Sequence, residues 1–175
     1  MAIRVGIPRT LAYYSFYPQW RMFLKGLGVK VVLSPPTTKE TIDAGIRYTV
    51  TDACIPIKSF HGHVEALAPL VDYILIPRLV CLDGQATFCP KFLGLSEMVE
   101  TSLPGLPPIL IPRLDIRDGR FAPMLAWIRI AKYLGVGRGK AILAYQRSIK
   151  ASQQYGDLLV QGMMPEEAMD SVFKW

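Results

Sequence analysis

The chain has 175 residues, about the length of one domain, with 51% hydrophobic and 19% charged residues and a mean hydropathy of +0.26. This composition excludes an intrinsically disordered chain, which combines low hydrophobicity with high charge. Three cysteines are too few for a small disulfide-stapled domain, and no apolar run reaches the roughly 18 residues that would span a membrane. We therefore expect a cytoplasmic protein. Its low charge indicates a surface partly covered by another subunit.

The net charge of +6 is concentrated in one part of the chain. Nine cations and two anions lie between Arg113 and Lys150, whereas the segment from Asp157 to Asp170 holds four acids and no base. A basic stretch attracts nucleic acid, anionic cofactors or an acidic partner, but it is also typical of a solvated helix face. Because no zinc finger, helix-turn-helix pattern or aromatic-interleaved basic motif is present, we expect no nucleic-acid partner.

Four short apolar segments predict buried strands, at 3–7, 29–33, 73–76 and 109–111. Each is rich in Val, Ile and Leu and is followed by Pro or Ser-Pro. Such near-continuous apolar strands, rather than alternating ones, are typical of a parallel sheet that is covered on both faces.

Helical patterns fill the intervals between these strands and the whole C-terminal part. They are expected at 19–27 after Pro18 in the first turn, at 38–48 with Thr38 as the cap, at 56–70 from Pro56, and at 93–103, 121–134, 140–160 and 165–173. The alternation predicts an α/β fold with a doubly wound, mostly parallel four-stranded sheet over residues 1–135, followed by a helical C-terminal extension over 136–175.

One hexamer occurs twice, since residues 74–79 and 109–114 both read ILIPRL, and the first strand ends similarly in Gly-Ile-Pro-Arg. Because proline cannot donate to a β-ladder, we expect each strand to end there, with Arg9, Arg78 and Arg113 just beyond the carboxyl ends. Ligands of open parallel sheets bind at that edge. The three guanidinium groups would then line one crevice, or each would make an ordinary surface ion pair.

The cysteines Cys54, Cys81 and Cys89 are expected in loops at the same edge of the sheet. Cys54 and Cys89 share a pattern in which a proline and then a lysine follow, Lys58 in one case and Lys91 in the other. Three thiolates suit a soft metal. The options are an iron–sulfur cluster, which normally takes four cysteines, a zinc ion with a fourth ligand, or three inert buried thiols.

Two histidines, His61 and His63, lie near the start of a predicted helix. Residues two apart point to different sides of a helix, so the pair is poorly placed to bind one metal together. Either could supply the fourth ligand of a zinc ion, or serve as an acid–base group near the crevice. A structural role in the core is the alternative for each.

Several motifs occur together: Gly-Ile-Pro-Arg at 6–9, Cys-x-Pro-x-Lys at 54–58, His-Gly-His at 61–63 and Cys-Pro-Lys at 89–91. In this combination the chain resembles the acyl-CoA dehydratase activase-related proteins, which are related to 2-hydroxyacyl-CoA dehydratase subunits and double-cubane cluster proteins. The resemblance covers residues from about 3 to 135.

The resemblance implies an iron–sulfur protein from an anaerobic setting that takes part in low-potential electron transfer or reduction with an ATP-dependent activase. It implies a [4Fe–4S] or double-cubane cluster, with the ligands Cys54, Cys81 and Cys89. The charged groups expected around an anionic cluster or an acyl-CoA ligand are Arg9, Lys58, Arg78 and Lys91. The groups expected to donate a proton or a hydrogen bond are His61 and His63.

Members of that family usually carry a second α/β half, whereas this sequence ends at Trp175. We therefore expect a homo-oligomer or a complex with a longer homologous subunit, through apolar surface beside the cysteines. The alternatives to electron transfer are a non-catalytic cluster carrier or partner subunit, and a zinc-stabilised binding module.

Overall fold

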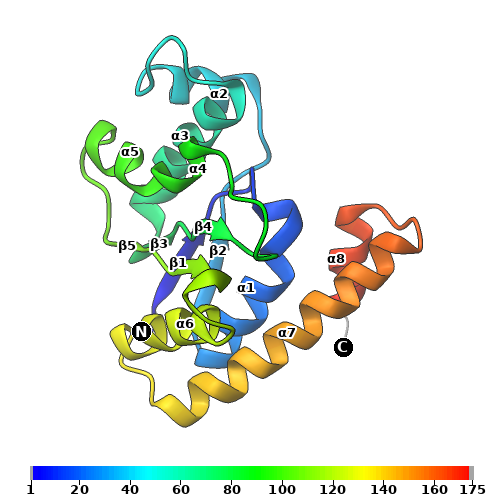
Figure 1. The fold of residues 1–175 in the computed structure, drawn as a ribbon. Helices are drawn as coiled ribbons and strands as arrows, with labels where there is room; N and C mark the ends of the chain where they lie inside the picture. Colours follow the sequence, from blue (N-terminus) through cyan, green and yellow to red (C-terminus); the bar gives the residue numbers. More distant parts are fainter. Residues whose placement is uncertain (1, 174–175) are drawn as a thin grey trace.

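The main sheet of the computed structural model, which describes residues 2–173, has four parallel strands in the order β2-β1-β3-β5 (Figure 1). The strands are β1 (Arg4–Ile7), β2 (Lys30–Leu33), β3 (Tyr73–Leu75) and β5 (Ile109–Leu110). Each lies within a predicted apolar segment. The structure therefore confirms the α/β fold and the doubly wound four-stranded sheet.

Helices cover both faces of this sheet (Figure 1). Leu75 and Leu110 face one apolar cluster, while their neighbour Ile74 faces the other, because side chains alternate along a strand. The first cluster contains residues of two helices, α1 (Tyr13–Leu27) and α6 (Ala122–Tyr133). The second contains residues of two others, α3 (Ile55–Leu67) and α5 (Leu95–Ser102). Burial on both faces explains why the strands are apolar throughout.

Strands β3 and β5 end before Pro77 and Pro112, as expected from the sequence, but the extended backbone does not stop there. The chain resumes as β4 (Arg78–Cys81) and β6 (Arg113–Asp115), which form a second, two-stranded parallel sheet. The pairing crosses the prolines, since Arg78 N donates to Pro112 O at 3.0 Å. The N–H groups that point toward the neighbouring segment 110–112 belong to residues 76 and 78. Residue 77 faces the other way, so a proline there removes no hydrogen bond between the two segments.

Helix α1 begins at Tyr13, six residues before the predicted start, and contains Pro18 in its interior. A proline there leaves the carbonyl four residues earlier without its helical donor. That carbonyl, Tyr14 O, instead accepts a hydrogen bond of 2.5 Å from the Tyr155 hydroxyl of α7 (Arg138–Val160). The prediction placed Pro18 in the first turn because it could not foresee this distant donor.

The remaining helices follow the predicted positions with small differences. Thr38 caps α2 (Lys39–Ile46) as predicted, accepting from Thr41 N. The helix expected at 56–70 ends as α3 and continues as a 3₁₀ turn, η1 (Ala68–Leu70). The helix expected at 93–103 is present as α5, and a short helix that was not expected, α4 (Pro90–Leu93), precedes it across Gly94. A second 3₁₀ turn, η2 (Ile116–Asp118), follows β6.

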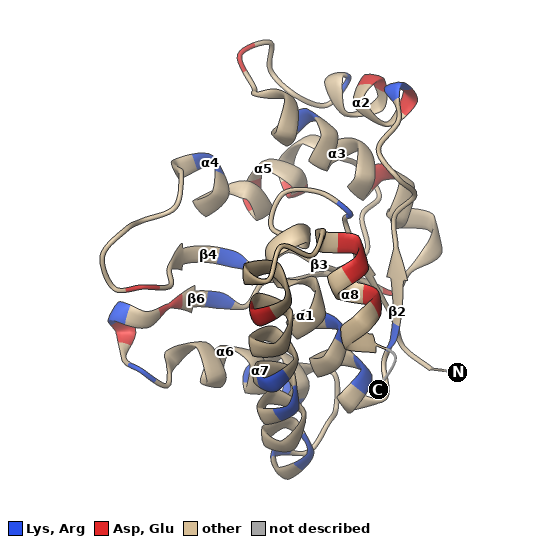
Figure 2. Ribbon diagram, turned by 90° about the vertical axis from the view of Figure 1, so that its right-hand side faces the viewer, with Lys and Arg blue, Asp and Glu red and all other residues tan. Residues whose placement is uncertain are grey.

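The C-terminal helices α7 and α8 (Pro165–Phe173) pack back onto α1 (Figure 1). Gly26 of α1 permits this close approach, because a Cβ there would lie 2.7 Å from the Ala144 Cβ of α7. Figure 2 shows cations along α7 and acids on α8, as the charge distribution of the sequence predicted. Among the described residues, no helix has the length and apolarity that a membrane crossing requires.

Candidate functional site: the cysteine edge

The strand order reverses beside β1, since β2 lies on one side of it and β3 and β5 on the other. In open α/β sheets this switch point, at the carboxyl ends of the strands, is the usual ligand-binding position. Arg9 follows β1 at this edge, and β4 extends from the end of β3. Because α3 leads back to the start of β3, its own N-terminus lies toward the same edge.

Cys54 and Cys89 occupy equivalent local positions. Cys54 is the N-cap of α3 and Cys89 the N-cap of α4, each helix has a proline in its first two positions, and both cysteines are exposed. Lys58 Nζ donates to Thr51 O at 2.9 Å and Lys91 Nζ donates to Asp52 O at 3.1 Å. Both lysines thus bind one loop just before Cys54, and this contact brings the start of α4 to the start of α3.

Cys81 is the buried last residue of β4, so its expected position in a loop is wrong. Its thiol donates to Asp83 Oδ1 at 3.6 Å. In the ladder it pairs with Asp115 of β6, a buried carboxylate that binds Arg113 at 2.8 Å and Arg117 at 3.0 Å. The hydrogen bond from Arg117 holds the pKa of Asp115 below its usual value.

The loop between Cys81 and Cys89 is closed at its base, because Phe88 N donates to Val80 O at 3.0 Å. The two thiols therefore flank one pinned loop, while the lysine contact holds Cys89 near the Cys54 loop. All three cysteines are free thiols. Among residues 2–173, no three His, Cys, Asp or Glu side chains are close enough to hold a single metal ion.

The three arginines of the Ile-Pro-Arg repeats each pair with a carboxylate. Arg9 donates to Glu166 of α8 at 2.7 Å. Arg78 pairs with Glu97 of α5, and Arg113 pairs with Asp115 and with Asp118 at 3.2 Å. The sequence left two expectations for these arginines, a shared crevice or separate ion pairs, and these contacts agree with separate ion pairs. Each side chain remains at least partly exposed, and Arg9 Nε and Arg78 Nε are buried without a hydrogen-bond partner among the described residues.

Both histidines of α3 are buried. His61 Nδ1 lies 2.8 Å from Ile57 O, and burial lowers its pKa against the opposing effect of that carbonyl. His63 Nε2 lies 2.9 Å from Thr37 Oγ1. Burial and the nearby Arg9 guanidinium lower the pKa of His63 to about 4. His63 is therefore neutral at pH 7, when it can take part in hydrogen bonds but holds no proton to release as an acid.

Sequence reasoning missed the residues that hold this edge together. They are Ser34, which accepts from Arg9 N at 2.8 Å, together with Thr37, Asp83, Asp115, Arg117 and Glu166. Ser34 and Thr37 follow β2 directly, which is a signal that could have placed them at the carboxyl edge. Glu166 lies 157 residues from Arg9, and nothing local in the sequence indicates that contact.

The fold and the edge together define a doubly wound α/β domain with free cysteines near the ligand-binding side of its sheet. A family model described as the CoA enzyme activase uncharacterised domain (DUF2229) matches residues 4–171. The chain therefore belongs to this CoA enzyme activase-related family, as the resemblance of its motifs indicated. Neither a curated protein nor a solved structure matches it.

Proposed function

We propose that this protein is an iron–sulfur component of a CoA-enzyme system, and that it passes low-potential electrons in concert with an ATP-dependent activase. Its cluster, of the [4Fe–4S] or double-cubane kind, would be held by Cys54, Cys81 and Cys89. The observation that carries the proposal is the matched pair of exposed N-cap cysteines, Cys54 and Cys89, joined through the loop that Lys58 and Lys91 bind.

The donor set fits such a cluster chemically. Thiolates are the ligands that iron–sulfur clusters take, and a cubane spreads its ligand sulfurs farther apart than a single ion does. Cys54 starts α3, a helix of 13 residues, where the unpaired N–H groups favour negative charge. Lys58, Lys91 and Arg117 add positive charge nearby, which would offset the charge of thiolate-bound iron and stabilise a more reduced state.

The cluster would supply the one-electron chemistry, and the protein's own residues would hold and tune it. Arg78 carries a buried Nε without a partner among the described residues, so it has a hydrogen bond still to donate near the end of β3. His63 likewise has a buried Nδ1 without a partner there. Because His63 is neutral at pH 7, its role in this proposal is to form hydrogen bonds and to hold Thr37 in place, not to donate a proton.

An exposed apolar surface beside Cys54 supports docking of a partner at the same edge. Val50 is 71% exposed and Ile55 is 56% exposed. Electron transfer needs close approach, so the activase, a second copy or a longer homologous subunit would cover these two side chains. Three thiols also leave a fourth cluster position for a ligand from that partner.

The test is to replace each cysteine by serine in anaerobically purified protein. We expect Cys81→Ser to lose the brown colour and most of the bound iron, and Cys54→Ser and Cys89→Ser to lose most of it as well. The far-UV circular dichroism and melting temperature of each variant control for folding. Iron content that is unchanged in a folded Cys81→Ser variant would contradict the assignment.

A further inference from the structure

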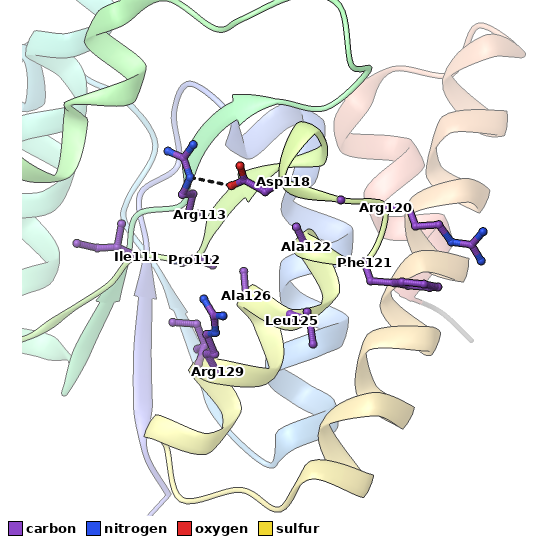
Figure 3. A pocket seen from close by; sticks show the side chains of 12 residues that line it. Ile111, Pro112, Arg113, Asp118, Arg120, Phe121, Ala122, Leu125, Ala126 and Arg129 are labelled. Atoms are coloured by element: carbon purple, nitrogen blue, oxygen red, sulfur yellow. Dashed lines mark hydrogen bonds and ion pairs between the residues drawn. The ribbon is translucent and has the colours of Figure 1, made fainter.

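A second concave site lies away from the cysteines, between the β5–β6 segment and α6 (Figure 3). Its volume is about 640 Å³, within the roughly 300–1,000 Å³ that is typical of small-molecule pockets. Most of its lining is apolar, with Pro112 on the strand side and Ala122, Leu125 and Ala126 on the helix side. Leu125 is 41% exposed, so part of this apolar surface is open to a ligand.

The charged residues of the pocket leave an excess of positive charge. Three arginines and one carboxylate line it, which gives a net charge of +2: Arg113, Arg120, Arg129 and Asp118. Arg113 is paired with Asp118 and also with the buried Asp115, so it offers little free charge to a ligand. In Figure 3 Arg129 rises from α6 toward Pro112 and Ala126, whereas Arg120 points away toward α7.

Arg129 is the cation best placed to bind a ligand, because it makes no ion pair within residues 2–173 and lies over the apolar floor. An arginine presents a fork of N–H donors that matches the oxygens of a phosphate or a carboxylate. A phosphate monoester carries about −1.5 to −2 charge at pH 7. Together with its three acceptor oxygens, this charge suits an unpaired guanidinium better than the single charge of a carboxylate does.

We propose that this pocket binds a phosphate ester carried on an apolar or flat body. Arg129 holds the phosphate, and the body lies over Pro112, Ala126 and Leu125. Phe121 lies at the edge of the pocket toward α7, where the Arg120 guanidinium lies over its exposed ring. The basic stretch seen in the sequence is therefore more than a solvated helix face. No cysteine lines the pocket, so phosphate binding does not require the cluster. The binding experiment therefore tests the pocket separately from the iron–sulfur proposal.

The test is isothermal titration calorimetry of the full chain with ADP and with coenzyme A, two phosphate-bearing molecules with different bodies, and with orthophosphate, which has none. The matched pair of variants is Arg129→Gln and Lys132→Gln. Each removes one exposed cation from α6, but only Arg129 lines the pocket. We expect ADP or coenzyme A to bind saturably with one site per chain, about tenfold or more weakly in Arg129→Gln and within about twofold of the wild type in Lys132→Gln.

A third variant, Ala126→Phe, fills the pocket and should abolish binding while the circular dichroism spectrum stays native. The proposal is overturned if neither organic phosphate binds, if the two glutamine variants weaken binding equally, or if orthophosphate binds as tightly as the organic phosphates. Should Ala126→Phe fail to fold, the comparison of Arg129→Gln with Lys132→Gln still decides the question.

Discussion

At the scale of single residues, His63 shows how a motif can be recognised before its role is understood. The His-Gly-His sequence indicated either a ligand, an acid–base group or a core residue. In the structure His63 is wholly buried, bonded to Thr37 and close to Arg9. Local sequence placed it on the correct helix, but its partners come from the loops after β1 and β2. Those long-range contacts decide its charge, and no local pattern encodes them.

The lowered pKa of His63 predicts a specific pH dependence of stability. Its pKa is 6.5 in the unfolded chain and about 4 in the folded one. Between pH 4 and pH 6.5 the unfolded state therefore binds more protons than the folded state does. The stabilisation is complete above pH 6.5 and is lost as the pH falls toward 4. The loss amounts to about 3 kcal/mol.

The measurement is urea unfolding of the wild type and of His63→Gln at pH 7 and at about pH 4. We expect the wild type to lose about 3 kcal/mol more than His63→Gln does over this interval. Because all carboxylates titrate in both proteins, the difference isolates His63. Equal losses in the two proteins would contradict the burial of a neutral imidazole.

At the scale of helices and strands, most elements follow from local chemistry, and the errors have physical causes. Apolar segments identified all four strands of the main sheet, and Thr38 identified the start of α2. The strands β4 and β6 were missed because the rule that proline ends a strand ignores which side of the strand its nitrogen faces. The interior position of Pro18 was missed because the Tyr155 hydroxyl, far along the chain, binds the carbonyl that the proline frees.

The hydrogen bond between Tyr155 and Tyr14 O predicts a coupling between α7 and Pro18. Tyr155→Phe should cost about 1 kcal/mol, since the Tyr14 carbonyl then loses the donor that the buried Tyr155 supplies. In a Pro18→Ala background the new backbone N–H can reach Tyr14 O, so the same substitution should cost less. Thermal unfolding of the four proteins of this cycle measures the coupling, and Tyr145→Phe on the same helix is the control. Strictly additive costs would refute it.

The crossing of α2 and α3 explains the glycine between the two histidines. A Cβ on Gly62 would lie 1.8 Å from Thr41 O, and one on Gly45 would lie 1.7 Å from Lys58 O. The atoms that such a Cβ would meet belong to the backbone, which cannot move aside as the tip of a side chain can. Gly62→Ala should therefore destabilise the protein by about 2–3 kcal/mol. Gly156→Ala in α7 meets nothing within 4 Å and should stabilise it by up to about 1 kcal/mol. Denaturant unfolding compares the two, and a neutral Gly62→Ala would show that the helices cross less closely.

At the scale of the whole molecule, the C-terminal helices join the core of the sheet domain through α1. Ala141, Ala151 and Tyr155 of α7 belong to the same apolar cluster as β1. The family model also extends through this region, to residue 171. Sequence patterns located α7 and α8 but did not show that they pack on the domain, because small residues such as Ala144 give a weak apolar signal at a close helix contact.

The cysteine edge is likewise a property of the whole fold. Cys54, Cys81 and Cys89 come from a helix N-terminus, a strand end and a second helix N-terminus. Their common edge followed from the predicted topology, whereas the lysine contacts and the Asp115 ion pairs that support it required the structure. The central claim is that this edge holds iron and sulfide.

The most direct test of that claim is to measure iron and acid-labile sulfide in the wild-type chain, expressed and purified without oxygen. We predict a brown protein with iron and sulfide in equal amounts, about four of each per cubane, and a visible absorption that bleaches on reduction. A colourless protein that retains its fold and contains no iron, or one zinc ion per chain in its place, would contradict the account.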